Sequence, residues 1–325
     1  MTDFSVLDLV PVREGESLTS AFAAARDLAV AAENAGCKRF WVAEHHAMEG
    51  IAGGATSVVL AHIGNATSRI RIGSGGIMLP NHSPFQIAEQ FGTLDALFPG
   101  RIDLGLGRAP GAGPELQRAL RKDLHRAAEM FPHDVAELRA LFAGEAEVRA
   151  TPGAGADPQM WVLGSSLFGA QLAARLGLPY AFASHFAPDH LDNALMLYRR
   201  DFQPSEACEK PHAMAAMNLF AAETEEEAQT LASSQLQAFV ALRTGRPGRL
   251  KPPIAGYRES LPPQAQAMLS HIGQASAIGT PGQVAETVKQ FIARTQADEI
   301  VFAGPTFDPQ KRIRSLEMTM DAVAA

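Results

Sequence analysis

The sequence has little cysteine and no long apolar run. Its two cysteines, Cys37 and Cys208, are too few for a disulfide framework or a cysteine-ligated zinc site in 325 residues, and Cys37 is expected to be buried. No window reaches the roughly 18 uncharged apolar residues that a membrane-spanning helix needs. The first residues, MTDFSVLDLV, show no basic leader followed by an apolar core. We therefore expect a cytoplasmic protein that does not bind membranes.

An excess of basic charge is also absent. The 28 Lys and Arg residues against 35 Asp and Glu give a net charge of −7, which argues against a nucleic-acid-binding surface. Hydrophobic residues make up 46% and charged residues 19% of the chain, the composition of an ordinary globular enzyme. A (β/α)₈ barrel often has this length as one domain, so a single domain over residues 1–325 is expected.

Strand-like apolar runs alternate with helical patterns along most of the chain. The helix predicted at 223–242 is rich in charge and is expected to be exposed. The segment Arg243–Ala277, rich in Pro, Gly and basic residues, is expected to be an insertion between the seventh and eighth strands over one barrel mouth. Strands are predicted at residues 4–10, 39–43, 69–78, 101–107, 159–163, 180–184, 212–222 and 298–304, and further helices at 18–35, 55–65, 84–97, 131–142, 167–176, 188–202, 279–295 and 309–323.

Eight strands that alternate with helices fit either a closed barrel or an open doubly wound sheet. A nucleotide-binding doubly wound sheet needs a glycine-rich turn after its first strand. The first strand here runs into LVPVR instead. The pattern therefore favours an α/β fold of the (β/α)₈ TIM-barrel type, in which functional residues follow the C-terminal ends of the strands.

The second predicted strand leads into Glu44-His45-His46. Because neighbouring side chains on a strand point to opposite faces, one histidine should face the pocket and the other the barrel wall or the next loop. A near-neutral pKa suits proton transfer there, and a pair of hydrogen-bonded loop histidines is the alternative. A metal site would prefer His-x-His, which this stretch lacks, so no metal is expected.

The third predicted strand contains a glycine-rich run, Gly73 to Gly76, and leads to His82. Glycine inside a strand weakens it and usually marks a bend or the close approach of a ligand to the backbone. A flat aromatic cofactor packed against Ser74, Gly75 and Gly76 would account for the run. A simple bend of the barrel is the alternative.

The fourth and fifth predicted strands each end in residues that suit a phosphate group. Arg108 follows a stretch of small residues, where its guanidinium could bind phosphate through two nitrogens. Ser165 and Ser166 lead into a helix, whose first amides can hold an anion. An ordinary serine N-cap is the commoner use of that pattern. Two such loops on adjacent strands indicate one phosphate site.

Three other histidines at strand ends are candidates for lining a substrate pocket. His46 follows the second predicted strand, His82 the third and His185 the sixth. Each could instead serve in capping or packing, so the pattern alone leaves both roles open.

Together these loops resemble the bacterial-luciferase-like, flavin-dependent monooxygenases, and in particular the alkanal-monooxygenase-like branch. The resemblance is densest between residues 40 and 111 and covers nearly the whole chain apart from the insertion. The motifs that carry it, in order, are FWVAEHH, TSRIRIGSGGIMLPNHSP, EQFGTLDALFPGRIDLGLGRAPG, WVLGSS, GLPYAFASHFAP, IGTPGQV and DEIVFAG.

The resemblance implies a TIM barrel that binds FMN and uses reduced FMN and O₂ to oxygenate a small organic substrate. A separate NAD(P)H-dependent flavin reductase would supply the reduced flavin, and the protein would form a homodimer. By position, His45 matches the family's catalytic histidine, Gly75–Gly76 its non-proline cis peptide against the flavin ring, Arg108 its phosphate arginine, and Ser165 and Ser166 its phosphate-binding loop.

One position departs from the light-emitting members of that family. They have a reactive cysteine just before the phosphate arginine, where this chain has Gly107. The difference weighs against light emission and a long-chain aldehyde substrate, but not against flavin binding. The alternatives are hydride transfer with a deazaflavin coenzyme, a non-catalytic flavin-binding protein, and a metal-dependent barrel hydrolase, which the missing His-x-His disfavours.

Overall fold

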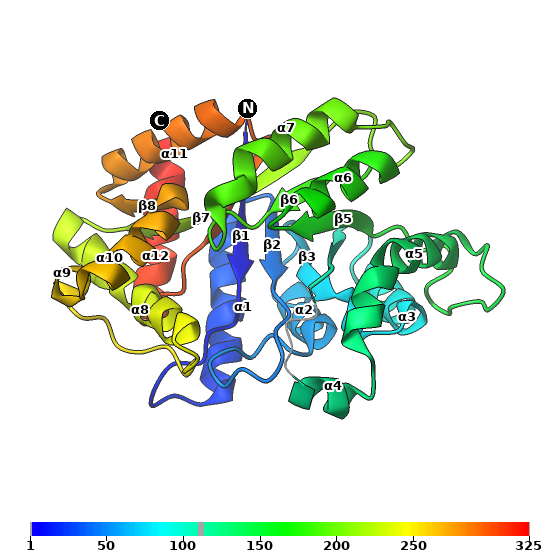
Figure 1. Ribbon diagram of the computed structural model, residues 1–325, viewed down its shortest axis with the longest axis horizontal. Helices are drawn as coiled ribbons and strands as arrows, with labels where there is room; N and C mark the ends of the chain where they lie inside the picture. The colour runs from blue at the N-terminus through cyan, green and yellow to red at the C-terminus, as the bar shows by residue number, and fades with distance from the viewer. Residues whose placement is uncertain (1, 110–113, 325) are drawn as a thin grey trace.

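The computed structural model describes residues 2–109 and 114–324 as a barrel of parallel strands surrounded by helices (Figure 1). Pro110 and Gly111, at the end of the motif that contains Arg108, lie outside these residues. Eight strands pair in the order β1-β2-β3-β4-β5-β6-β7-β9, and β9 pairs again with β1, which closes the barrel. They are β1 (Asp3–Asp8), β2 (Arg39–Val42), β3 (Arg71–Met78), β4 (Ile102–Gly107), β5 (Gln159–Gly164), β6 (Tyr180–Phe182), β7 (Ala213–Ala221) and β9 (Glu299–Ala303).

The helices pack around the barrel, and their ends follow familiar capping chemistry. Ser17 caps the first helix by accepting from the Ser20 amide, and Thr280 forms a capping box with Gln283. None of the described helices is long and apolar enough to cross a membrane. The helices are α1 (Leu18–Asn34), α2 (Thr56–Gly64), α3 (Pro84–Leu97), α4 (Pro114–Leu120), α5 (Leu124–Ala143), α6 (Leu167–Leu176), α7 (Leu191–Asp201), α8 (Glu225–Arg243), α9 (Tyr257–Ser260), α10 (Pro263–Ile272), α11 (Pro281–Thr295) and α12 (Pro309–Ala324).

The region between β7 and β9 corrects two of the sequence predictions. The predicted insertion 243–277 contains α9 and α10 and ends in an additional strand, β8 (Ser276–Gly279), which pairs with the last residues of β7. The helix α8, expected to be exposed, packs one side against β7 and β8 and buries Leu231 and Gln237. A four-residue strand is too short to show a period in the sequence.

Two predicted strands, 4–10 and 180–184, end two residues earlier in the structure. Val10 has a φ of 51°, in the left-handed region, so the extended backbone of β1 cannot continue through it. The C-terminal ends of β1 and β2 point toward the lower part of Figure 1, where α4 and the segment after α8 lie. That end of the barrel is its mouth.

Side chains in the barrel interior alternate with those that face the helices. On β2, Trp41 packs inside the barrel, while Phe40 and Val42 pack against the surrounding helices. The inward series continues from Trp41 through Ala43, so the alternation directs His45 into the mouth.

The opposite, N-terminal end of the interior is filled by charged side chains. Arg39 donates to Asp103 at 2.9 Å and to Glu299 at 3.1 Å, and all three side chains are at most 3% exposed. Trp41 donates to the same Asp103 carboxylate at 2.9 Å. These contacts neutralise the buried charges and close the end of the barrel that carries no active-site loops.

Candidate active site

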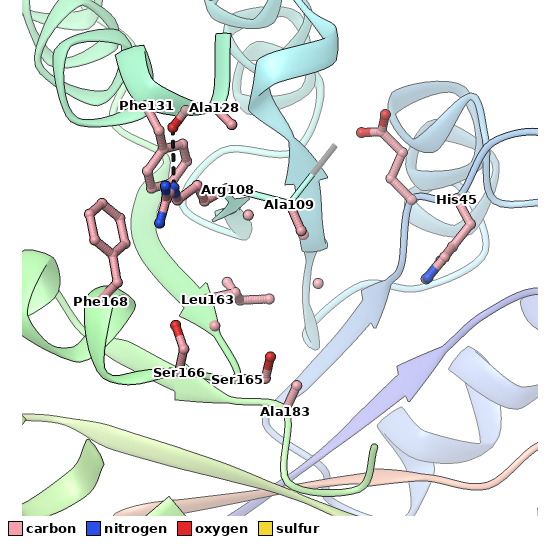
Figure 2. Close-up of a pocket in the computed structure, with 16 residues that line it drawn as sticks. His45, Arg108, Ala109, Ala128, Phe131, Leu163, Ser165, Ser166, Phe168 and Ala183 are labelled. Carbon is pink, nitrogen blue, oxygen red and sulfur yellow. Dashed lines mark hydrogen bonds between the residues drawn. The ribbon is translucent and has the colours of Figure 1, made fainter. Parts of the chain in front are cut away.

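A cavity of about 470 Å³ opens at the barrel mouth between β2 and β6. Its volume lies within the range of roughly 300–1,000 Å³ that is typical of small-molecule sites. In Figure 2, Arg108 and Phe168 lie on one side of the cavity and His45 on the other. The lining residues that the sequence had singled out are His45, Gly75, Gly76, Gly107, Arg108, Ser165 and Ser166, and the others are Glu44, Ala109, Ala128, Phe131, Leu163, Gly164, Phe168, Gly169 and Ala183.

His45 lines the cavity as the last inward-facing residue after β2. Its Nδ1 is buried and has no hydrogen-bond partner within the described part of the chain. Burial lowers the pKa of His45, the nearby Glu44 raises it, and His46 lowers it further, with a net shift downward. The imidazole is therefore neutral at pH 7, and its unpartnered Nδ1 is enclosed by the protein.

His46 and His82 face Glu44. Both imidazoles hydrogen-bond through Nε2 to Oε1 of Glu44, His82 at 2.6 Å, and the Met78 amide donates to the other carboxylate oxygen at 3.0 Å. Burial raises the pKa of Glu44, but the hydrogen bonds from His82, His46 and Met78 outweigh it and lower the pKa. This cluster fixes the loops after β2 and β3 beside His45.

His46 and His82, which were predicted to line a substrate pocket, are instead engaged in hydrogen bonds to Glu44. Among the described residues that line the cavity, neither appears. Their nitrogens and the Glu44 carboxylate lie within 4.8 Å of one another, so the three could bind a cation. The imidazole contacts to Glu44 already satisfy the buried carboxylate as a hydrogen-bonded cluster.

Gly75 and Gly76 lie where β3 meets the cavity and are joined by a cis peptide bond. A Cβ on Gly76 would lie 2.7 Å from the Gly105 carbonyl oxygen, and one on Gly75 would lie 2.5 Å from Leu7 Cδ1. At Gly76 a side chain would collide with the backbone of β4, whereas at Gly75 it would require the Leu7 side chain to move. Ser74 points away from the cavity and donates to the Gly105 carbonyl at 2.9 Å.

Arg108 is held by the kink-prone part of α5. Pro132 lies inside that helix and has no N–H, so the carbonyl of Ala128, one turn earlier, is left without its usual helical donor. The Arg108 Nε donates to this carbonyl at 3.2 Å (Figure 2), and its guanidinium lies 4.1 Å from the centre of the Phe168 ring. These two contacts direct the guanidinium along the cavity wall.

Ser165 and Ser166 follow β5 and precede α6. Ser166 is the N-cap residue with extended backbone, yet its side chain makes no capping hydrogen bond in the described structure. The first amides of α6 therefore carry no side-chain cap, and both serines are exposed and line the same cavity as Arg108. Uncapped amides at a helix N-terminus, two hydroxyls and a guanidinium are groups that suit an anion.

His185, the third predicted pocket histidine, does not line this cavity but a smaller one beside it. Sequence reasoning did not identify Glu44, Phe131, Phe168 or Pro132 as parts of the site. A glutamate directly before two histidines was the available signal for Glu44. The other three come from helices, where a sequence shows no link to a strand end far away along the chain.

Comparison with known proteins places this arrangement in a family. The family model of the luciferase-like monooxygenases matches residues 2–299. A "Luciferase-like monooxygenase" of Escherichia coli strain K12 is 48% identical over 328 residues, covering 99% of this chain and 98% of that protein. An "N-acetyl-S-alkylcysteine monooxygenase" of Bacillus subtilis is 32% identical and covers 100% and 99% of the two chains.

Solved structures have the same fold along their whole length. Apo-MsnO8 superposes with a TM-score of 0.89 at 30% identity and covers 100% of this chain and 99% of its own. The oxygenating constituent of a 3,6-diketocamphane monooxygenase of Pseudomonas putida, solved in complex with FMN, gives a TM-score of 0.76 at 18% identity, with 100% and 98% covered. The chain therefore belongs to the luciferase-like monooxygenase family and is a flavin-dependent monooxygenase.

Proposed function

We propose that this chain binds FMN in the larger cavity and uses it, in reduced form and with O₂, to oxygenate a small organic substrate. The proposal rests mainly on one observation: the residues that suit an anion and His45 line opposite sides of the same cavity (Figure 2). Arg108, Ser165, Ser166 and the amides of α6 suit a phosphate. The bare backbone of Gly75 and Gly76 suits a flat ring.

The chain's own residues then have separate tasks. Bound reduced FMN supplies two electrons, which allow one atom of O₂ to enter the substrate while the other leaves as water. Arg108 and the α6 amides would hold the phosphate, and the backbone of Gly75 and Gly76, which lines the cavity, would face the ring. His45, which lines the cavity and is neutral at pH 7, can accept a proton and return it.

The supply of reduced flavin and the assembly follow from the resemblance. We propose that a separate NAD(P)H-dependent reductase delivers reduced FMN, since one relative, 20% identical over 226 residues, is the "oxygenase component" of a flavin-dependent trigonelline monooxygenase. A homodimer in the cytoplasm is part of the same proposal. Light scattering would measure the number of copies in solution.

Titration separates FMN from the deazaflavin alternative. The full-length protein is titrated anaerobically with reduced FMN and with a reduced deazaflavin coenzyme, and with the oxidised forms, while flavin absorbance and fluorescence are followed. We expect FMN to bind and the deazaflavin to bind at least tenfold more weakly. Preferential binding of the deazaflavin would instead favour hydride transfer, and no binding of either below about millimolar would refute a flavin site.

Replacement of His45 tests its role separately from binding. His45→Ala should abolish oxygenation by protein supplied with reduced FMN, while FMN affinity changes by less than about threefold, because the phosphate contacts stay intact. A thioether and a ketone serve as trial substrates, with loss of O₂ and formation of oxygenated product measured together. Retention of product formation in His45→Ala would show that the proton is handled elsewhere.

A further inference from the structure

A second cavity, of about 140 Å³, opens at the mouth on the other side of the barrel. It lies at the C-terminal ends of β1 and β9 and is covered by α8 and the segment that follows it. Apolar cavities of about 150 Å³ stay dry and accept a molecule the size of benzene. The side chains that make its wall apolar include Leu9, Met48, Ile51, Phe239, Leu250 and Pro305.

A histidine lines each of the two cavities, His45 the proposed flavin cavity and His185 the smaller one. In the closed order of eight strands, β2 and β6 lie opposite each other, and His45 and His185 follow these two strands. Burial and then the charge of His45 lower the pKa of His185 to about 4. His185 therefore marks the side of the smaller cavity that is turned toward the strand opposite, which carries His45.

The polar atoms of the smaller cavity are few. Among the described residues that line it, only His185 and Gln235 carry a side-chain nitrogen or oxygen. Gln235 donates through Nε2 to Asn218 at 2.7 Å, which fixes its amide. The Nδ1 of His185 is buried and lacks a hydrogen-bond partner in the described ranges. A ligand group here would be mainly apolar, with one polar contact at the histidine end.

The outer rim of the cavity is basic and aromatic. Phe186 and Phe239 meet edge to face at 6.1 Å, and the Arg243 guanidinium lies 5.7 and 5.0 Å from their ring centres. The segment 243–251, RTGRPGRLK, has four basic residues and no acidic one, in a chain with a net charge of −7. Its Arg249 pairs with Glu49, whereas Arg243 contacts the rings at the rim. The rim thus favours an anion.

We propose that the substrate of this monooxygenase is a small amphipathic acid, whose apolar group occupies the cavity between Leu9 and Phe239 and whose anionic group binds Arg243. The size limit is a phenyl ring or an alkyl group of about six carbons. The proposal rests on the flavin site described above, because it places the atom to be oxygenated near His185 and His45. The proposal excludes a long-chain aldehyde, because its alkyl chain is too long for the cavity and it has no negative charge to bind Arg243.

Binding of graded probes tests the class of substrate. The full-length protein saturated with oxidised FMN is titrated by calorimetry with 3-phenylpropanoate, 3-phenylpropanamide, propanoate and decanal. We expect 3-phenylpropanoate to bind at least tenfold tighter than propanoate, which lacks the ring, and about three- to fivefold tighter than the amide, which lacks the charge. Equal binding of propanoate, or tightest binding of decanal, would overturn the proposal.

Two pairs of variants locate the probe. Ala238→Phe fills the cavity from α8 and should weaken 3-phenylpropanoate at least tenfold, whereas Ala241→Phe, on the same helix but away from the lining, should not. Arg243→Gln should remove the preference for the acid over the amide, and Arg243→Lys should restore it. Unchanged binding in Ala238→Phe, or a preference that survives Arg243→Gln, would refute the assignment.

The same samples distinguish this proposal from the flavin proposal. FMN is titrated into each variant, and its affinity should stay within about twofold of the wild type, since Ala238 and Arg243 do not line the flavin cavity. If FMN binds but the phenyl probe does not, the substrate assignment alone is wrong. If the probe binds and FMN does not, the flavin assignment is wrong and the apolar cavity stands as a site for an amphipathic acid.

Discussion

The phosphate assignment of Arg108 can be tested by comparing two flavins that differ only in the phosphate. FMN carries the phosphate and riboflavin does not, so a phosphate contact affects one affinity and not the other. Arg108→Ala removes the guanidinium that stands 4.1 Å from the Phe168 ring and donates to the Ala128 carbonyl. The variant should therefore weaken FMN selectively.

The expected size follows from the contacts. A hydrogen bond to a charged group contributes roughly 1.5–3 kcal/mol, which corresponds to a loss of roughly 10- to 150-fold in FMN affinity. Riboflavin affinity should change by less than about twofold. Arg108 is exposed, so the stability of the fold should change little.

Pro132 offers a second variant that acts on the orientation of Arg108. Pro132→Ala restores an N–H that can donate to the Ala128 carbonyl, the group that Arg108 contacts at 3.2 Å. It should weaken FMN by a smaller factor than Arg108→Ala, leave riboflavin unchanged, and stabilise α5. A matched control is Arg126→Ala on the outer face of α5, which should alter neither flavin.

The assay is quenching of flavin fluorescence during titration with protein, for FMN and riboflavin in parallel. Thermal unfolding of each variant excludes loss of the fold as a cause. If Arg108→Ala weakens both flavins equally, or neither, the phosphate lies elsewhere. The α6 amides with Ser165 and Ser166 would then be the remaining anion site.

Three further predictions concern the barrel itself. Gly76→Ala should lower the free energy of unfolding by about 1–3 kcal/mol, because its Cβ would lie 2.7 Å from the Gly105 carbonyl oxygen. Gly107→Ala, whose Cβ would have its nearest contact at 3.6 Å, should leave the stability measured by urea unfolding nearly unchanged. Asp103→Ala should cost about 3–5 kcal/mol, because it leaves the buried Arg39 with less compensation; a loss below about 1 kcal/mol would contradict this. Burial and His45 hold the pKa of His185 at about 4 against an ordinary 6.5, so the unfolded chain binds a proton that the folded chain does not. Stability should fall as the pH drops from 6.5 to 4, by up to roughly 2 kcal/mol more than in His185→Phe, and parallel pH profiles would refute the coupling.

Strand ends were the part of the site that the sequence predicted best. The alternation of strands and helices gave all eight barrel strands. Alternation after β2 predicted that one of His45 and His46 faces the pocket, and the family resemblance indicated His45. The proximity of Arg108 to Ser165 and Ser166 follows from the same logic, because parallel strands all end at one face. The order of apolar and polar residues within each segment is therefore enough to predict which segments form the strands and which loops follow them.

Contacts between distant segments could not be predicted from local patterns. The pairing of Arg39 with Asp103 and Glu299 joins residues 64 and 260 positions apart. The role of Pro132 depends on the Ala128 carbonyl facing a strand end, which no sequence period shows. The short strand β8 was hidden in a segment whose Pro and Gly content indicated a loop.

The division of the mouth follows from side-chain size at one level of the barrel. His45 and His185 follow opposite strands, and they line the larger and the smaller cavity, respectively. In the half between β2 and β6, the inward positions at this level are Gly75, Gly107 and Ala183, and their lack of bulk leaves about 470 Å³. In the other half, Leu9 and the residues of α8 fill the space and leave about 140 Å³.

Size and polarity therefore change together across the histidine pair. The larger half has uncapped helix amides and Arg108, which suit a charged cofactor, whereas the smaller half is apolar up to its basic rim. Molecules in the two halves would approach each other at His45 and His185, which line the larger and the smaller cavity, respectively. Replacing Gly107 with a larger residue should weaken the binding of the flavin but not of the substrate. Replacing Ala238 with a larger residue should weaken the binding of the substrate but not of the flavin. A variant at either position that weakened both ligands equally would show that the two halves form one undivided site.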